Sequence, residues 1–153
     1  MFFQALNHYK PKDNLTIKQL ETNFLKDFPH NTSINWFKKE FEYVTGIDIF
    51  EYNFNKKNGY KIIYTDDFDI FLFRTDFLDH LEDEIGDFLE IENYKLIKSN
   101  LSSNKPYSHL YKEFKKDFYI DKDLANNIYN SKTANYFFTT AEINEFKNNK
   151  TQY

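Results

Sequence analysis

A short polar segment ahead of a basic helical pattern holds the side chains best suited to bind an anion. It offers hydroxyl, amide and ammonium groups on Ser103, Asn104, Lys105, Tyr107 and Ser108. Backbone N–H groups at the start of a helix have no partner within the helix and attract negative charge. The pattern therefore indicates an anion site, with a phosphate as a suitable ligand. An ordinary polar loop with a helix cap is the alternative interpretation.

Arg74 is a second candidate for binding an anion. It is the only arginine of the chain, and it directly follows the compact apolar run from Asp69 to Phe73. Ligands of open α/β sheets collect at the carboxyl ends of strands, and a guanidinium there can hold an anion through two parallel hydrogen bonds. We therefore predict that Arg74 binds substrate. The alternative is an ion pair within the chain, to Asp76 or Asp79.

Several other chemistries are excluded by the residues. The chain has no cysteine, which excludes disulfides, thiolate zinc sites and a cysteine nucleophile. Its four histidines are scattered without metal-ligand spacing, and the acidic cluster Asp66, Asp67 and Asp69 lacks the glycine turn of a calcium loop, so a solvated turn explains it better. Phosphate-binding Gly-Lys-Ser/Thr loops and Gly-x-Ser-x-Gly elbows are absent too. We expect no metal and assign no catalytic residue.

Length, charge and hydropathy bound the class of protein. A chain of 153 residues, 41% of them hydrophobic, is long enough for one domain with a substantial core. The net charge of −4 argues against general attraction to nucleic acid or to an anionic membrane. No apolar run reaches the length of a signal-peptide core or of a membrane span. We therefore expect a cytoplasmic protein without an integral membrane segment.

Hydrophobic periodicity predicts a helix-rich chain with a small sheet. Helical spacing covers residues 2–9, 16–28, 31–46, 75–88, 107–118, 121–130 and 140–146. Alternation on both sides of Asn58-Gly59 predicts a hairpin or paired extended segments over residues 47–64. The runs Asp69 to Phe73 and Tyr94 to Lys98 lack alternation, which is typical of strands covered on both faces in a parallel sheet. The expected class is therefore α/β, with a small, partly parallel sheet.

The order of these segments resembles a known family, the bacterial capsular polysaccharide synthesis proteins, which look like sulfotransferases. The family signature Asn-Lys-Trp-Tyr-Ser, followed by a Leu-Tyr-Lys-Glu-Phe-Lys helix, corresponds here to residues 104–108 and 110–115. Further blocks correspond to residues 36–41, 45–50, 58–60, 69–78, 128–132 and 137–146. Pro106 replaces the tryptophan of the signature, which removes an aromatic ring and a backbone donor.

The resemblance implies a fold and a reaction. The fold would be the helix-rich C-terminal portion of a sulfotransferase-like, P-loop type domain over residues 1–153, lacking the N-terminal nucleotide loop. The reaction would move a sulfuryl group from 3′-phosphoadenosine 5′-phosphosulfate to a hydroxyl of a polysaccharide or other glycan acceptor, without a metal. Lys105 and the Ser103–Ser108 turn would cover the donor, and helices nearer the start would shape the acceptor cleft. The catalytic residues would precede residue 1, so the chain is expected to be truncated and inactive alone.

A second function remains open at this stage. The abundance of phenylalanine and tyrosine, 18 and 12 residues, also suits a helix-rich carbohydrate-binding or interaction module without catalytic activity. Affinity for a nucleotide would separate the two functions.

Overall fold

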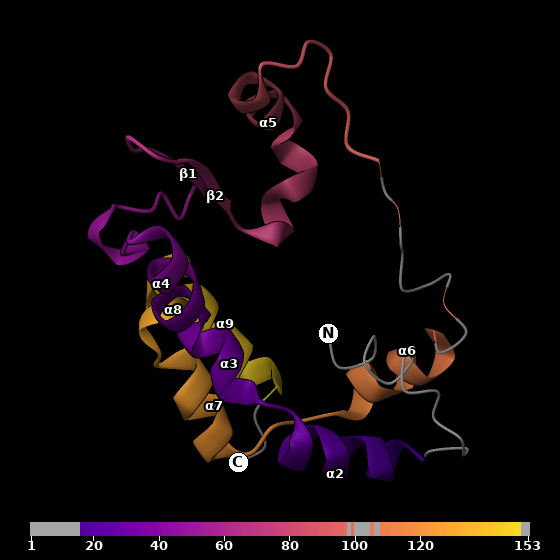
Figure 1. Cartoon of the computed structure of the whole chain (residues 1–153). Coiled ribbons are helices and arrows are strands. Elements are labelled where there is room, and N and C mark those ends of the chain that lie inside the picture. Colours follow the sequence, from indigo (N-terminus) through magenta and orange to yellow (C-terminus); the bar gives the residue numbers. More distant parts are fainter. Residues whose placement is uncertain (1–15, 98, 100–104, 106–107, 151–153) are drawn as a thin grey trace.

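The computed structural model describes residues 16–97, 99, 105 and 108–150, and most of these residues are helical (Figure 1). The elements in chain order are α2 (Ile17–Asp27), α3 (His30–Trp36), a π-helical turn η1 (Phe37–Phe41), α4 (Glu42–Thr45), a 3₁₀ turn η2 (Ile49–Glu51), β1 (Tyr60–Tyr64), β2 (Asp69–Phe73), a 3₁₀ segment η3 (Thr75–His80), α5 (Glu82–Leu89), α6 (Ser108–Asp117), α7 (Lys122–Tyr129), α8 (Lys132–Phe137) and α9 (Thr140–Lys150). The helix expected over residues 2–9 lies outside the described residues.

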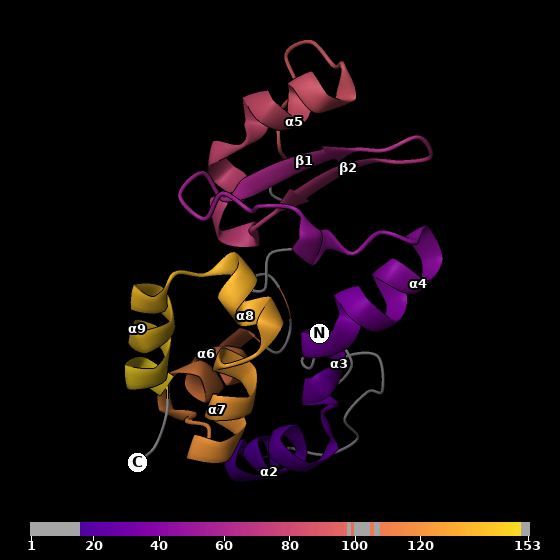
Figure 2. The ribbon, with the colours of Figure 1, turned by 90° about the vertical axis from the view of Figure 1, so that its left-hand side faces the viewer.

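The elements form three groups along the molecule. Figures 1 and 2 show the sheet and α5 at one end, α2 at the other, and α3, α7, α8 and α9 between them, while α6, which packs on α2, lies to one side of α3, α7 and α8 in Figure 1. Within the described residues, no helix has the length and apolar character needed to cross a membrane.

Capping residues explain where several helices begin and end. The Thr16 hydroxyl accepts a hydrogen bond from the Gln19 N–H at 3.3 Å, and the Gln19 side chain accepts one from the Thr16 N–H at 2.9 Å, which forms a capping box at the start of α2. Asp121 caps α7 by accepting from the Leu124 N–H at 2.8 Å. Gly46, with φ of 71°, ends α4 in the left-handed conformation. The helices expected over residues 16–28, 107–118, 121–130 and 140–146 are confirmed to within a few residues. The helix expected over residues 31–46 is instead α3, η1 and α4 in succession, and the helix expected over residues 75–88 is the 3₁₀ segment η3 followed by α5.

The sheet differs from the expected one. β1 and β2 pair antiparallel, with Tyr60 opposite Phe73 and Tyr64 opposite Asp69. The described strands therefore form an antiparallel sheet and not the partly parallel sheet that was expected. The reason is the connection, since only residues 65–68 join the two strands, whereas a parallel pair needs a crossover of a dozen or more residues. In the turn, the Thr65 N–H donates to the Phe68 carbonyl at 3.0 Å.

Two further strand predictions fail for local reasons. Residues 94–97 form no strand, because the Leu96 N–H donates to the Glu82 side chain at 3.0 Å instead of to a neighbouring strand. Residues 49–51 form η2, since the Asp48 carboxylate accepts from the Phe50 N–H at 2.9 Å. The Asn58-Gly59 turn does form, but it is closed by a single antiparallel bridge between Asn55 and Tyr60.

The burial of β2 fits its place in a two-stranded sheet. Leu72 is buried, whereas Ile70, Phe71 and Phe73 are half-buried, and β2 pairs only with β1 within the described residues. The strand is therefore not covered on both faces as expected. The P-loop type fold and the single domain over residues 1–153 stay predictions.

Aromatic packing joins the sheet to the helices. Ile49, Phe54, Leu72 and Phe137 form a buried cluster that connects η2, β2 and α8. At the far end, α2 packs on α6 through phenylalanine rings, with centroid distances of 5.8 Å for Phe24–Phe114 and 5.2 Å for Phe24–Phe118. Most of the aromatic excess thus lies in packing contacts rather than on a binding surface.

Candidate functional site

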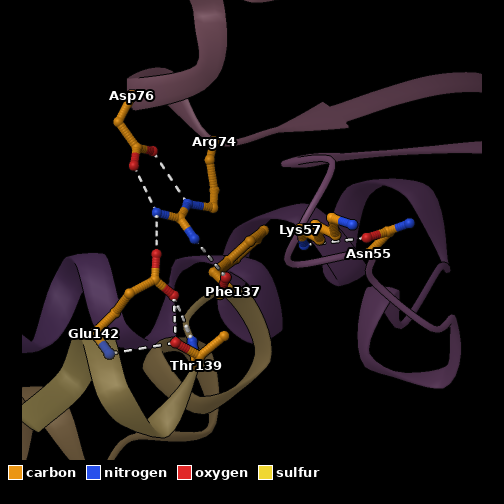
Figure 3. A network of polar contacts seen from close by, with 7 residues as sticks. All are labelled: Asn55, Lys57, Arg74, Asp76, Phe137, Thr139 and Glu142. Atoms are coloured by element: carbon orange, nitrogen blue, oxygen red, sulfur yellow. Dashed lines mark hydrogen bonds and ion pairs between the residues drawn. The ribbon is translucent and has the colours of Figure 1, made fainter.

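Arg74 lies at the end of β2 and connects it to the C-terminal helices (Figure 3). The residue is only 5% exposed. Its Nε and Nη2 atoms lie 3.1 Å and 2.5 Å from the two oxygens of Asp76, and Nη2 lies 2.8 Å from Glu142 Oε1. Nη1 donates to the Phe137 carbonyl at 3.3 Å. These contacts occupy four of the five N–H donors of a guanidinium.

The surroundings of Arg74 favour a structural role. Its guanidinium carbon lies 4.9 Å from the centroid of the Phe77 ring and 4.4 Å from that of Phe138. The ion pair to Asp76 is one of the two pairs considered as the alternative to substrate binding. Because most donors of Arg74 are already engaged inside the chain, its contact with substrate stays a prediction and gains no support from this geometry.

The carboxylates of this network are strongly favoured in their charged form. The hydrogen bond from Arg74 lowers the pKa of Glu142 to about 2, opposed by burial and assisted by the Thr139 N–H and hydroxyl, which both donate to Glu142 Oε2 at 2.7 Å. The same guanidinium also lowers the pKa of Asp76. The network therefore resists protonation until the pH is well below neutrality.

The predicted anion site is described only in part. Ser103, Asn104 and Tyr107 lie outside the described residues. Lys105 is half-buried, and its carbonyl accepts from the N–H of Ser108, the first residue of α6, at 2.9 Å. The two residues thus form the turn that leads into a helix with Lys112, Lys115 and Lys116. An anion bound by Lys105 stays a prediction.

Acidic and histidine side chains form no metal centre in the part of the chain that the structure describes, where no three of them come together.

A polar groove between two pairs of helical segments is a site that the sequence analysis missed. It has a volume of about 560 Å³ and lies between α3 with η1 on one side and α7 with α8 on the other. Amide side chains predominate among its lining residues, which are Asn31, Ile34, Asn35, Lys38, Phe50, Asn126, Asn127, Asn130, Ser131, Lys132 and Thr133. Helical spacing was a usable signal, since Asn31 and Asn35, like Asn126 and Asn130, lie four residues apart on one helix face.

Two hydrogen bonds, one between side chains and one from a side chain to the backbone, join the two walls. Asn127 Nδ2 donates to Asn31 Oδ1 at 2.8 Å, and the Thr133 hydroxyl donates to the Ile34 carbonyl at 2.7 Å. Within α3, Asn35 Nδ2 donates to the Asn31 carbonyl at 2.9 Å. Both cross-wall bonds join residues far apart in the sequence, so the groove is a product of the tertiary fold.

The charges of the groove are balanced by nearby carboxylates. Lys38 Nζ lies 2.5 Å from Glu42 Oε1, and Lys132 Nζ lies 3.7 Å from Asp48 Oδ2. The Lys132 ammonium also lies 4.2 Å from the centroid of the Phe50 ring. The groove is therefore polar without a strong net charge from these residues.

A smaller groove of about 360 Å³ adjoins the first at Phe50. It is bounded by residues 50–54, Lys56, Asn135 and Tyr136. The Tyr136 hydroxyl donates toward the carbonyls of Ile49 and Tyr52, at 2.8 Å and 2.9 Å. Burial and the Asp48 carboxylate raise the pKa of Tyr136 to about 12. This tyrosine is therefore a hydrogen-bonded part of the framework.

Comparison with known proteins identifies one family. The model of a family described as "Putative capsular polysaccharide synthesis protein" matches residues 8–139. No curated protein and no solved structure matches the chain significantly. The match covers β1, β2, the Arg74 strand end, α6 and all residues that line the larger groove. The chain belongs to this family of capsular polysaccharide synthesis proteins.

Proposed function

We propose that this chain acts in capsular polysaccharide synthesis as part of a sulfotransferase-like protein. The donor would be 3′-phosphoadenosine 5′-phosphosulfate, and the acceptor would be a hydroxyl group of a saccharide. The observation that carries the proposal is the family match over residues 8–139, which includes the polar turn before α6. The position of Lys105 directly ahead of this basic helix supports it.

The chemistry assigns a limited role to this chain. In sulfuryl transfer, the bond from sulfur to the donor's phosphate oxygen breaks, a bond from sulfur to the acceptor oxygen forms, and the hydroxyl proton passes to a base. The Lys105 ammonium and N–H groups at the start of α6 would bind donor phosphates and stabilise the charge that develops on the leaving oxygen. No residue of the chain is assigned as the base.

A nucleotide titration tests the proposal. Adenosine 3′,5′-bisphosphate, the product left by the donor, is titrated into the protein by calorimetry at low ionic strength. We expect saturable binding that Lys105→Ala weakens about tenfold, as loss of a charge-assisted hydrogen bond predicts. Lys39→Ala, which removes an exposed lysine from η1, serves as the matched control. Absence of saturable binding, or equal weakening by the two substitutions, would refute the assignment.

A carbohydrate-binding protein without transferase activity is the second candidate. The amide-lined groove favours it, because amides and hydroxyl groups are complementary hydrogen-bonding partners. Saturation by an oligosaccharide, with no response to adenosine 3′,5′-bisphosphate, would favour this candidate over the first.

A further inference from the structure

The larger groove has α3 and η1 on one side and α7 and α8 on the other. Some of the hydrogen-bonding groups that line it are not used by the bonds described above. The Asn126 side chain is half-buried in the groove and has no hydrogen-bond partner within the described residues. The Asn127–Asn31 bond uses one N–H of Asn127 and the side-chain oxygen of Asn31. The carbonyl oxygen and second N–H of Asn127, and both amide hydrogens of Asn31, are not used by that bond.

These free groups include both donors and acceptors. Asn130 adds to them, since its side-chain oxygen accepts from Lys147 Nζ at 2.8 Å while its amide hydrogens are not part of that contact. A ligand that both donates and accepts matches such a lining, whereas a ligand that only accepts, such as a phosphate, leaves the amide oxygens unpaired. Hydroxyl groups have this dual character.

The charges of the groove give an anionic ligand no strong advantage. Lys38 is paired with Glu42, and Lys132 is paired with Asp48. An incoming carboxylate or sulfate would have to compete with carboxylates that are already in place. The Lys132 ammonium covers the face of the Phe50 ring that is nearest to it. A sugar therefore cannot stack on that face, and the groove must recognise it by hydrogen bonds.

The shape of the groove is fixed by the fold before any ligand binds. The Asn127–Asn31 and Thr133–Ile34 bonds join its opposite walls, and a site fixed in advance spends less free energy on ordering when a ligand binds. We propose that this groove binds an uncharged, hydroxyl-rich segment of a saccharide chain.

The position of the groove fits a polymeric ligand. Figure 1 shows the start of α6 at the right of the molecule, away from α3, α7 and α8. A saccharide in the groove therefore lies away from the start of α6, and only a saccharide chain longer than the groove would extend toward it. The biological role of the groove as an acceptor surface rests on the proposed function, but binding itself does not.

The test uses nuclear magnetic resonance, because each asparagine side chain gives its own pair of amide signals in a ¹H–¹⁵N spectrum. Neutral oligosaccharides of glucose, galactose, mannose and N-acetylglucosamine are added singly, and oligogalacturonate serves as the acidic probe. We expect at least one neutral probe to shift the side-chain signals of Asn31, Asn126 and Asn127, with the acidic probe weaker. Asn126→Ala should weaken that binding about fivefold, the effect of about one lost hydrogen bond.

Control variants make the outcome decisive. Asn144→Ala removes an exposed amide from α9, outside the groove, and should leave binding unchanged. Asn126→Leu keeps a similar side-chain size without donors, acceptor or charge, so it tests the same point if Asn126→Ala fails to fold. No shift with any neutral probe, shifts that avoid the groove, or tighter binding of oligogalacturonate would overturn the inference.

The result also separates this inference from the proposed function. If both hold, Lys105→Ala weakens only the nucleotide and Asn126→Ala weakens only the saccharide. Loss of nucleotide binding with retained saccharide binding would refute the donor assignment alone, and the reverse would refute the groove alone.

Discussion

Replacing Glu142 by glutamine tests whether the Arg74 network stabilises the junction between the sheet and the C-terminal helices. Glu142 lies in the first turn of α9, and its partner Arg74 directly follows β2, so the pair joins two groups of elements (Figure 3). Glutamine has the same shape but no charge. The substitution therefore removes the ionic contribution and also the hydrogen bonds at one of the two oxygens, because the amide NH2 cannot accept from Arg74 or Thr139.

The size of the effect follows from the pKa of Glu142. The pKa falls from 4.5 to about 2, chiefly because of the hydrogen bond from Arg74. A difference of one pKa unit corresponds to about 1.4 kcal/mol. The ionised Glu142 therefore contributes at most about 3 kcal/mol to the free energy of unfolding. The side chain is 31% exposed, so solvent screening reduces the expected contribution to about 1–2 kcal/mol.

The sign of the pH dependence is fixed by the direction of the shift. Because the pKa is lower in the folded protein than in the unfolded chain, the stabilisation is complete above pH 4.5 and is lost as the pH falls toward 2. Glu142→Gln should therefore be less stable than the unaltered protein at neutral pH, and the difference should shrink in acid.

Urea unfolding followed by circular dichroism measures both quantities. Glu145→Gln is the matched control, because Glu145 lies on the same helix and is exposed, so its loss should cost no more than about 0.5 kcal/mol. The reasoning is refuted if the two variants are equally stable at neutral pH, or if the deficit of Glu142→Gln does not change with pH.

Four further substitutions, in two matched pairs, test the framework. Gly59→Ala should destabilise by about 2–4 kcal/mol, because φ is 76° and a Cβ atom would lie 2.3 Å from the Phe77 ring. Gly46→Ala, with φ of 71° but open space around it, should cost only about 1 kcal/mol, and equal melting temperatures for the two variants would contradict the packing argument. Tyr136→Phe should lower the free energy of unfolding in urea by about 1–2 kcal/mol, since the hydroxyl contacts two main-chain carbonyls. Tyr64→Phe, at an exposed position, should lower it by almost nothing, and a similar loss for the two variants would count against a stabilising role of the Tyr136 hydroxyl.

Local signals predicted most of the helices. Thr16, Asp121 and Gly46 each determine a helix boundary through a cap or a left-handed residue, and such caps act within a few positions of the chain. The short helix α8 was not predicted, because six residues give too little periodicity. Its start carried a signal nonetheless, since the Ser131 hydroxyl accepts from the Ala134 N–H at 3.1 Å.

Long-range pairing explains most of what the sequence analysis missed. Apolar content predicted β2, but whether its partner runs parallel depends on the connection, which periodicity does not measure. The ion pair of Arg74 with nearby Asp76 was within reach of local reasoning, whereas the pair with Glu142 required the fold. The groove likewise combines α3 with α7, whose amides meet only after the helices pack.

The most direct test of the central claim is one ¹H–¹⁵N titration in which a neutral oligosaccharide and adenosine 3′,5′-bisphosphate are added in turn to the same sample. If both proposals hold, the protein responds to both ligands, with the nucleotide shifting signals of Lys105 and Ser108 and the sugar shifting the side-chain amides of Asn126 and Asn127. A spectrum that neither ligand changes would contradict the account.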